Sequence, residues 1–147
     1  MIDNTVRDYV FNVIQEKGFH DTAFSHLQSL TWRQICHLFI ELGEFYQSDS
    51  PEELADVAIV FLDLLGLHGI DVPKVEPRLE SAANAIAEMA NLYRKQGVLV
   101  ADRVWSCILG LAEHLDIDLY EAVMAKMKKN ERRPKLYGLH KEGENDR

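Results

Sequence analysis

One segment of the chain is apolar on nearly every side when it is read as a helix: residues 50–68, SPEELADVAIVFLDLLGLH. It begins as helices often do, because Ser50 is a favourable N-cap, Pro51 suits the first helical position, and the acidic Glu52 faces the positive end of the helix. Gly69 predicts where the helix ends. A helix that is apolar all round is buried. The segment therefore predicts the central helix of the fold.

Helical periodicity recurs on both sides of this segment, and nothing in the sequence predicts a strand or a hairpin turn. Asp3, Thr31 and Asp118 are candidate N-caps, and Gly18 and Gly97 are candidate helix ends. Five further helices are predicted, over about residues 4–17, 32–47, 80–95, 100–115 and 119–132. We expect an all-α bundle of about five to six helices, forming a single domain over residues 1–138 with a polar tail at 139–147.

The chain also resembles itself at a nearly constant offset. Residues 40–47 (IELGEFYQ) align with 87–94 (AEMANLYR), and residues 69–72 (GIDV) align with 116–119 (DIDL), both at an offset of 47. Between them, residues 55–57 (ADV) align with 101–103 (ADR) at an offset of 46. This pattern favours a tandem duplication of a helical hairpin, the first over about 31–69 and the second over about 80–133.

Composition narrows the possible functions. The 147 residues carry a net charge of −8, which argues against a nucleic-acid-binding surface, since such a surface needs clustered Lys and Arg. Cys36 and Cys107 each lie in an apolar helical segment and are expected to be buried free thiols. We expect no secretory signal, because residues 1–30 show no signal-peptide pattern, and the longest apolar run, Val57–Leu67, is too short to span a bilayer. We expect a cytoplasmic protein with no membrane partner.

Two pairs of acids carry the functional argument: Glu41 with Glu44, and Glu53 with Asp56. Each pair is spaced i, i+3, so both carboxylates project from one face of their helix. The second pair lies on the apolar helix, where an unpaired buried carboxylate costs several kcal/mol. Lys and Arg are absent from residues 34–73, so the local charge balance favours an external cation. Oxygen ligands suit Mg²⁺, with Mn²⁺ as a second possibility. The alternative is that the acids form an ordinary solvated face.

The spacing of these acids resembles the signature of the MazG-like all-α nucleoside triphosphate pyrophosphohydrolases. Residues 53–59 (ELADVAI) resemble the metal-binding helix of that family, and residues 117–123 (IDLYEAV) resemble part of its C-terminal segment. The pattern Lys126-x-x-x-Asn130-x-x-Arg133, followed by Pro134, resembles the rest of that segment. The likeness covers residues from about 31 to 138.

The resemblance implies Mg²⁺-dependent hydrolysis of nucleoside or deoxynucleoside triphosphates to monophosphate and pyrophosphate, by a chain that forms a homodimer or higher homo-oligomer. It also implies a set of site residues. The implied metal ligands are Glu41, Glu44, Glu53 and Asp56, and the implied substrate contacts are Lys126, Asn130 and Arg133. Two departures from the family stand out: the gap between Glu44 and Glu53 is short, and the C-terminal segment follows a second hairpin. Whether that segment reaches the acids within one chain stays open here.

Two further residues, His37 and Trp32, are candidates for the site, and two of the acids could have a second role. Glu41 or Glu44 could orient the attacking water, and His37, one turn before Glu41, could contact the substrate. Trp32 could stack on a nucleobase, although core packing is the alternative. Two other functions remain open: a non-enzymatic helical module that binds a nucleotide or a partner, and a hydrolase of a related phosphorylated nucleotide. A P-loop mechanism is excluded, because the Gly-rich phosphate-binding motif is absent.

Overall fold

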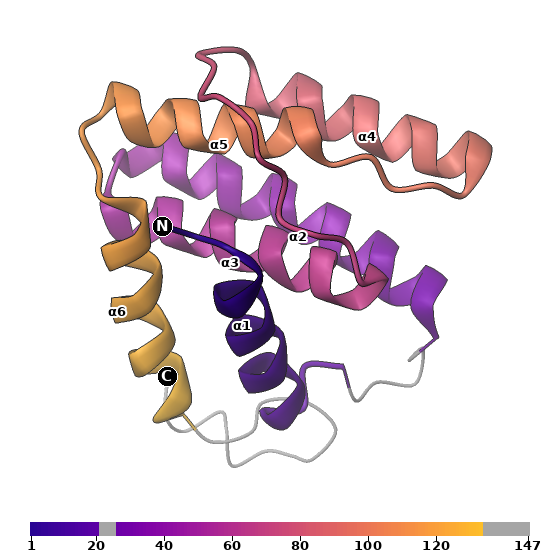
Figure 1. Ribbon diagram of the computed structural model, residues 1–147, viewed down its shortest axis with the longest axis horizontal. Coiled ribbons are helices and arrows are strands. Elements are labelled where there is room, and N and C mark those ends of the chain that lie inside the picture. Colours follow the sequence, from indigo (N-terminus) through magenta and orange to yellow (C-terminus); the bar gives the residue numbers. More distant parts are fainter. Residues whose placement is uncertain (21–25, 134–147) are drawn as a thin grey trace.

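The structure is a computed structural model that describes residues 1–20 and 26–133. Within these ranges the regular structure is entirely α-helical, which confirms the predicted fold class (Figure 1). The six helices are α1 (Asn4–Glu16), α2 (Leu27–Ser48), α3 (Pro51–His68), α4 (Ala82–Gln96), α5 (Asp102–His114) and α6 (Leu119–Glu131). None of the helices in these ranges is both long enough and apolar enough to cross a membrane. The predicted polar tail at 139–147 lies outside the described residues.

The central helix is α3, as its sequence predicts. Leu54, Ala55 and every residue from Val57 to Leu65 are buried. Helix α2 packs along it in a hairpin, while α1, α5 and α6 cover its other sides. Figure 1 shows α1 and α6 crossing the α2–α3 pair next to each other, so that the first and last helices lie on the same side of the core.

Local capping explains most of the helix boundaries. The side chains of Asp3, Ser50 and Asp118 each accept a hydrogen bond from a backbone N–H in the first turn of their helix, as predicted. The prediction that Thr31 caps α2 was wrong, because α2 begins at Leu27, five residues before the predicted start at residue 32. Thr31 is buried inside the helix, where its hydroxyl donates to the carbonyl of Leu27 at 2.7 Å. Its side chain is therefore already satisfied within the helix and caps nothing.

Helices α4 and α5 form a second hairpin, which packs on the first through α2–α4 and α3–α5 contacts. The acid that corresponds to Glu41 in this hairpin is Glu88, and it is exposed and paired with Arg103 at 2.7 Å. The duplication itself stays a prediction. The segment before α4 lies very close to α5, because a Cβ added at Gly110 would sit 2.0 Å from the carbonyl oxygen of Arg78.

The two cysteines differ from each other. Both are free thiols, and Cys107 is buried as expected. Cys36 is exposed, so the prediction that it is buried was wrong. The reason is its place on the helix: the buried stripe of α2 runs through Ile35, Leu38, Leu42 and Phe45, and Cys36 lies beside that stripe.

Candidate functional site

The α2–α3 hairpin brings together three of the four predicted metal ligands. Glu41 of α2 and Glu53 and Asp56 of α3 each place one carboxylate oxygen within 4.8 Å of the others. The tight turn between the helices makes this possible, since only Asp49 and Ser50 separate them. Glu44 is exposed and lies outside the group of three. Its assignment as a fourth ligand stays a prediction.

Neighbouring side chains satisfy the three carboxylates only in part. Glu41 Oε2 lies 3.0 Å from His37 Nε2, and Asp56 Oδ1 lies 3.3 Å from Lys126 Nζ. Glu41 Oε1 and Glu53 Oε2 are buried, and neither has a hydrogen-bond partner among the described residues. A buried acceptor without a partner is unfavourable, and more so when it is charged. The group is therefore incomplete as it stands.

Electrostatics at Asp56 support this conclusion. Burial raises the pKa of its carboxyl from 3.8 to about 6. The Lys126 ammonium group acts in the opposite direction, and the nearby Glu41 and Glu53 carboxylates raise the pKa further. A positive charge supplied from outside would favour the ionised form of Asp56.

The residues present fit a small divalent cation. All the donors are carboxylate oxygens, which Mg²⁺ and Mn²⁺ prefer, and two oxygens of these acids are buried with no hydrogen-bond partner in the described part of the chain. One internal cation does reach the group: Lys126 comes from α6, although no Lys or Arg lies between residues 34 and 73. A single ammonium group does not balance three carboxylates. The expected need for a further cation remains.

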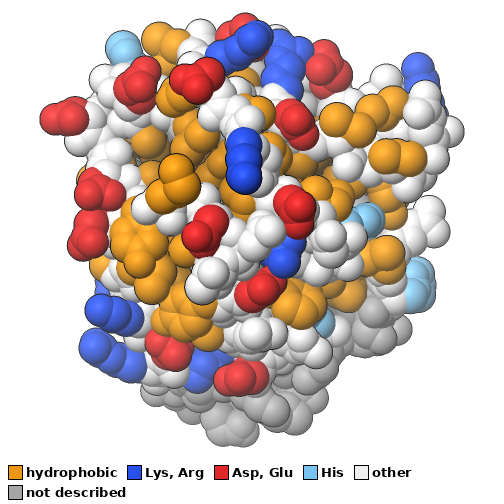
Figure 2. Space-filling view, in the orientation of Figure 1, with side chains coloured by type: hydrophobic (Ala, Val, Ile, Leu, Met, Phe, Trp, Pro, Cys, Tyr) orange, Lys and Arg blue, Asp and Glu red, His pale blue; other side chains and the backbone are white. Residues whose placement is uncertain are grey.

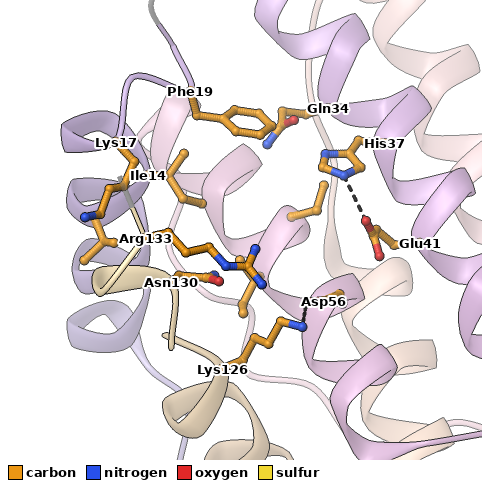
Figure 3. Close-up of a pocket in the computed structure, with 13 residues that line it drawn as sticks. Ile14, Lys17, Phe19, Gln34, His37, Glu41, Asp56, Lys126, Asn130 and Arg133 are labelled. Atoms are coloured by element: carbon orange, nitrogen blue, oxygen red, sulfur yellow. Dashed lines mark hydrogen bonds and ion pairs between the residues drawn. The ribbon is translucent and has the colours of Figure 1, made fainter. Parts of the chain in front are cut away.

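A cavity of about 280 Å³ opens beside the acids, between α1, α2, α3 and α6 (Figure 3). Glu41 and Asp56 line it from the α2–α3 side, and Lys126, Asn130 and Arg133 line it from the other side. The last three lie on one face of the C-terminal segment, because their spacing is i, i+4, i+7. The C-terminal segment thus reaches the acids within one chain, which settles the question that the sequence left open.

Two other candidates have different positions. His37 lines the cavity next to Glu41, as its assignment as a substrate contact requires. Trp32 does not line the cavity. Its ring packs edge-on against Tyr93 of α4, with centroids 5.4 Å apart, while other residues of the chain bury part of its surface. This position agrees with core packing and gives no support to stacking on a nucleobase.

Sequence reasoning missed several residues of the cavity. Phe19, just after α1, lies with its ring nearly parallel to that of His37, at 6° and 5.8 Å between centroids. Gln34 also lines the cavity, and its amide donates to the fully buried Asp63 at 2.6 Å. The sequence did indicate that Asp63 needs hydrogen-bond partners, because its carboxylate lies within the apolar helix. What the sequence did not reveal is that Gln34 and His20 are those partners.

The visible face of the molecular surface carries both acidic and basic side chains. Figure 2 shows acidic and basic side chains scattered over one face among apolar ones, with no single basic patch on that face. At the rim of the site, Lys129 lies 3.5 Å from Glu52, and both side chains are exposed. Such exposed pairs contribute little to stability.

The site is thus defined by its own geometry: three converging carboxylates, a cavity, and basic and amide groups facing the acids. The resemblance to MazG-like pyrophosphohydrolases stays a prediction that rests on the motifs given above. Comparisons with models of protein families, with curated proteins and with solved structures find no match.

Proposed function

We propose that this protein hydrolyses nucleoside or deoxynucleoside triphosphates to the monophosphate and pyrophosphate, with Mg²⁺ as cofactor and Mn²⁺ as a possible substitute. The proposal rests on one observation: carboxylates line one side of the cavity, and basic side chains line the other. Glu41 and Asp56, with Glu53 close to both, offer oxygen ligands on one side. Lys126 and Arg133 offer positive charge on the other. A triphosphate with its metal ion is a ligand that needs both.

The roles of the basic and amide groups follow from their chemistry. Lys126 and Arg133 would bind phosphate oxygens, and the guanidinium of Arg133 can do so with two parallel hydrogen bonds. The amide of Asn130 would donate a further hydrogen bond. Phosphoryl transfer depends mainly on positioning and on stabilising negative charge, which is what this wall provides.

The acidic wall would hold the metal and orient the water. Mg²⁺ bound by Glu41, Glu53 and Asp56 would supply charge neutralisation and polarise a phosphoryl oxygen. Glu41, whose Oε2 faces His37 Nε2, is the first candidate for orienting the attacking water, and the exposed Glu44 is the second. The water attacks phosphorus, the anhydride bond between the α- and β-phosphates breaks, and pyrophosphate leaves.

Association of two or more chains is a further part of the proposal. Phe39, Ile40 and Tyr46 on α2 expose 40%, 58% and 50% of their surfaces. Large apolar side chains that gather on one helix and remain exposed are typical of a contact surface. A homodimer or higher homo-oligomer that buries them is therefore expected, and sedimentation velocity would measure it.

The activity can be tested with a panel of ribo- and deoxynucleoside triphosphates, assayed with Mg²⁺ or Mn²⁺ while both products are identified by ion-exchange chromatography. Glu53→Gln is expected to abolish turnover, because it removes a metal ligand while keeping the shape of the side chain. Glu88→Gln is the matched control, since Glu88 is the exposed acid of the second hairpin, paired with Arg103, and should leave activity intact.

Three outcomes would contradict the proposal. Activity that survives Glu53→Gln would show that the proposed metal site is not needed. Release of phosphate instead of pyrophosphate would show that the protein catalyses a different reaction. If no nucleotide in the panel is hydrolysed and the melting temperature does not respond to Mg²⁺, the non-enzymatic binding module would be favoured.

A further inference from the structure

One part of the cavity is aromatic and apolar instead of charged. Figure 3 shows Phe19 and His37 beside each other at the end of the pocket away from Lys126. Their rings are nearly parallel, with 6° between the planes. Four aliphatic side chains also line the cavity: Val13, Ile14, Ile59 and Val60. The cavity therefore offers a flat aromatic surface at one end and ion-binding groups at the other.

Phe19 is held in place by contacts that need no ligand. The guanidinium of Arg33 donates to the backbone carbonyl of Phe19 and lies 4.5 Å from the centre of its ring. The next residue, His20, places Nε2 3.1 Å from both carboxylate oxygens of Asp63. Asp63 is fully buried in α3 and also accepts a hydrogen bond from Gln34. A buried, hydrogen-bonded carboxyl group at the centre of the core thus fixes the segment that carries Phe19.

We propose that Phe19, with His37 beside it, is the platform on which the planar base of the nucleotide stacks, and that the Asp63–His20 pair positions Phe19 for that contact. This inference rests on the proposed function, because it takes the ligand of the charged end to be a polyphosphate. An aromatic ring held in advance of binding loses little conformational freedom when the base arrives. Every base has a flat face that can stack on an aromatic ring, so we expect this contact to accept several different bases.

The test compares two ligands that share phosphates and differ in the base. Binding of an α,β-methylene nucleoside triphosphate and of inorganic tripolyphosphate, each with Mg²⁺, would be measured by isothermal titration calorimetry on the full chain. Phe19→Ala is expected to weaken binding of the nucleotide by roughly 5- to 100-fold, the usual range for one stacked base. Binding of tripolyphosphate should stay within about twofold of wild type, because its contacts lie at the charged end.

Further variants separate stacking from folding. Phe19→Trp should restore the affinity for the nucleotide, and Phe19→Leu should lose part of it while keeping apolar volume in the cavity wall. Tyr120→Ala is the matched control, since Tyr120 is an aromatic residue of α6 that is 36% exposed and does not line the cavity. It should change neither affinity.

The positioning pair needs its own comparison. His20→Ala should weaken binding of the nucleotide selectively, whereas His20→Gln should retain most of it, because the glutamine amide can still donate to Asp63. Loss of affinity for both ligands in His20→Ala would indicate a merely structural role for the pair and would overturn this part of the proposal.

The outcomes also separate this inference from the proposed function. If wild type binds both ligands but hydrolyses no triphosphate, the enzymatic function fails while the platform stands. If Phe19→Ala leaves the affinity for the nucleotide unchanged, or weakens tripolyphosphate equally, the platform fails whatever the activity. If wild type binds neither ligand, both proposals fail.

Discussion

Asp56→Asn is expected to stabilise the protein when no divalent metal is present. Burial raises the pKa of Asp56 from 3.8 to about 6, even though Lys126 lies 3.3 Å away. A difference of about 2 in pKa corresponds to about 3 kcal/mol of unfavourable charge burial. The side chain keeps 21% of its surface exposed, and solvent screening reduces the effect. We therefore expect the variant to gain about 1–2 kcal/mol at pH 8, because asparagine has a similar shape and carries no charge.

The pH dependence of this gain follows from the direction of the pKa change. The pKa in the folded state is higher than in the unfolded state, so between about pH 4 and pH 6 the folded protein binds more protons. Stability of the wild type consequently falls as the pH rises through this window, and the full cost of the charge is present above pH 6. Asp56→Asn removes that cost, so its advantage should be absent near pH 4 and complete at pH 8.

Thermal melts in EDTA at pH 4 and pH 8 would measure the effect. A gain of 1–2 kcal/mol in a chain of this size corresponds to a melting temperature higher by roughly 3–8 °C. Saturating Mg²⁺ should stabilise the wild type and leave the variant nearly unchanged. Asp102→Asn is the control, because Asp102 is the exposed counterpart of Asp56 in the second hairpin and should bring no gain. A lower melting temperature for Asp56→Asn in EDTA at pH 8 would refute the reasoning, since it would mean that the ion pair with Lys126 outweighs the cost of burying the charge.

Three further predictions concern other parts of the molecule. Lys126→Met should raise the KM for the triphosphate roughly 10- to 100-fold in steady-state kinetics, because a charge-assisted hydrogen bond is lost, whereas Lys126→Arg should retain most of the affinity. Gly110→Ala should lower the free energy of unfolding, measured in urea, by about 2–3 kcal/mol, because the added Cβ would collide with the backbone of Arg78. Gly43→Ala is the control, because a Cβ there contacts no other described atom within 4 Å, and it should stabilise the protein by up to about 1 kcal/mol. Trp32→Phe should leave the nucleotide dissociation constant within twofold of wild type, because Trp32 packs against α4 outside the cavity.

Features that act locally could be predicted from the sequence. The caps at Asp3, Ser50 and Asp118 depend on a side chain and a backbone N–H two or three residues away, so their positions followed from the residue types. The start of α2 was missed for the same reason. His26 provides no side-chain cap, so the first turn carries no local signal, and Thr31 offered a misleading one.

For the site, too, the sequence predicted some features and missed others. The resemblance named Lys126, Asn130 and Arg133 as substrate contacts, and the predicted hairpin placed Glu41 near Asp56, but nothing in the local sequence indicated that the two groups share a cavity. That depends on how α6 crosses α3, which is a property of packing over a distance of 70 residues in the chain (Asp56 to Lys126). A tertiary contact of this kind leaves no trace in periodicity.

The way α6 closes the cavity has a consequence for control of the site. Two anchors hold its end against α1: the Tyr9 hydroxyl donates to Glu131 Oε1 at 2.6 Å, and Lys17 Nζ donates to the Glu131 carbonyl at 2.7 Å. Helices α2 and α3 pack directly against each other, and that contact does not run through α6. Detachment of α6 would therefore carry Lys126 and Asn130 away from the cavity while the carboxylates of α2 and α3 stay together, and a ribosome-bound chain would complete its acidic half before its basic half.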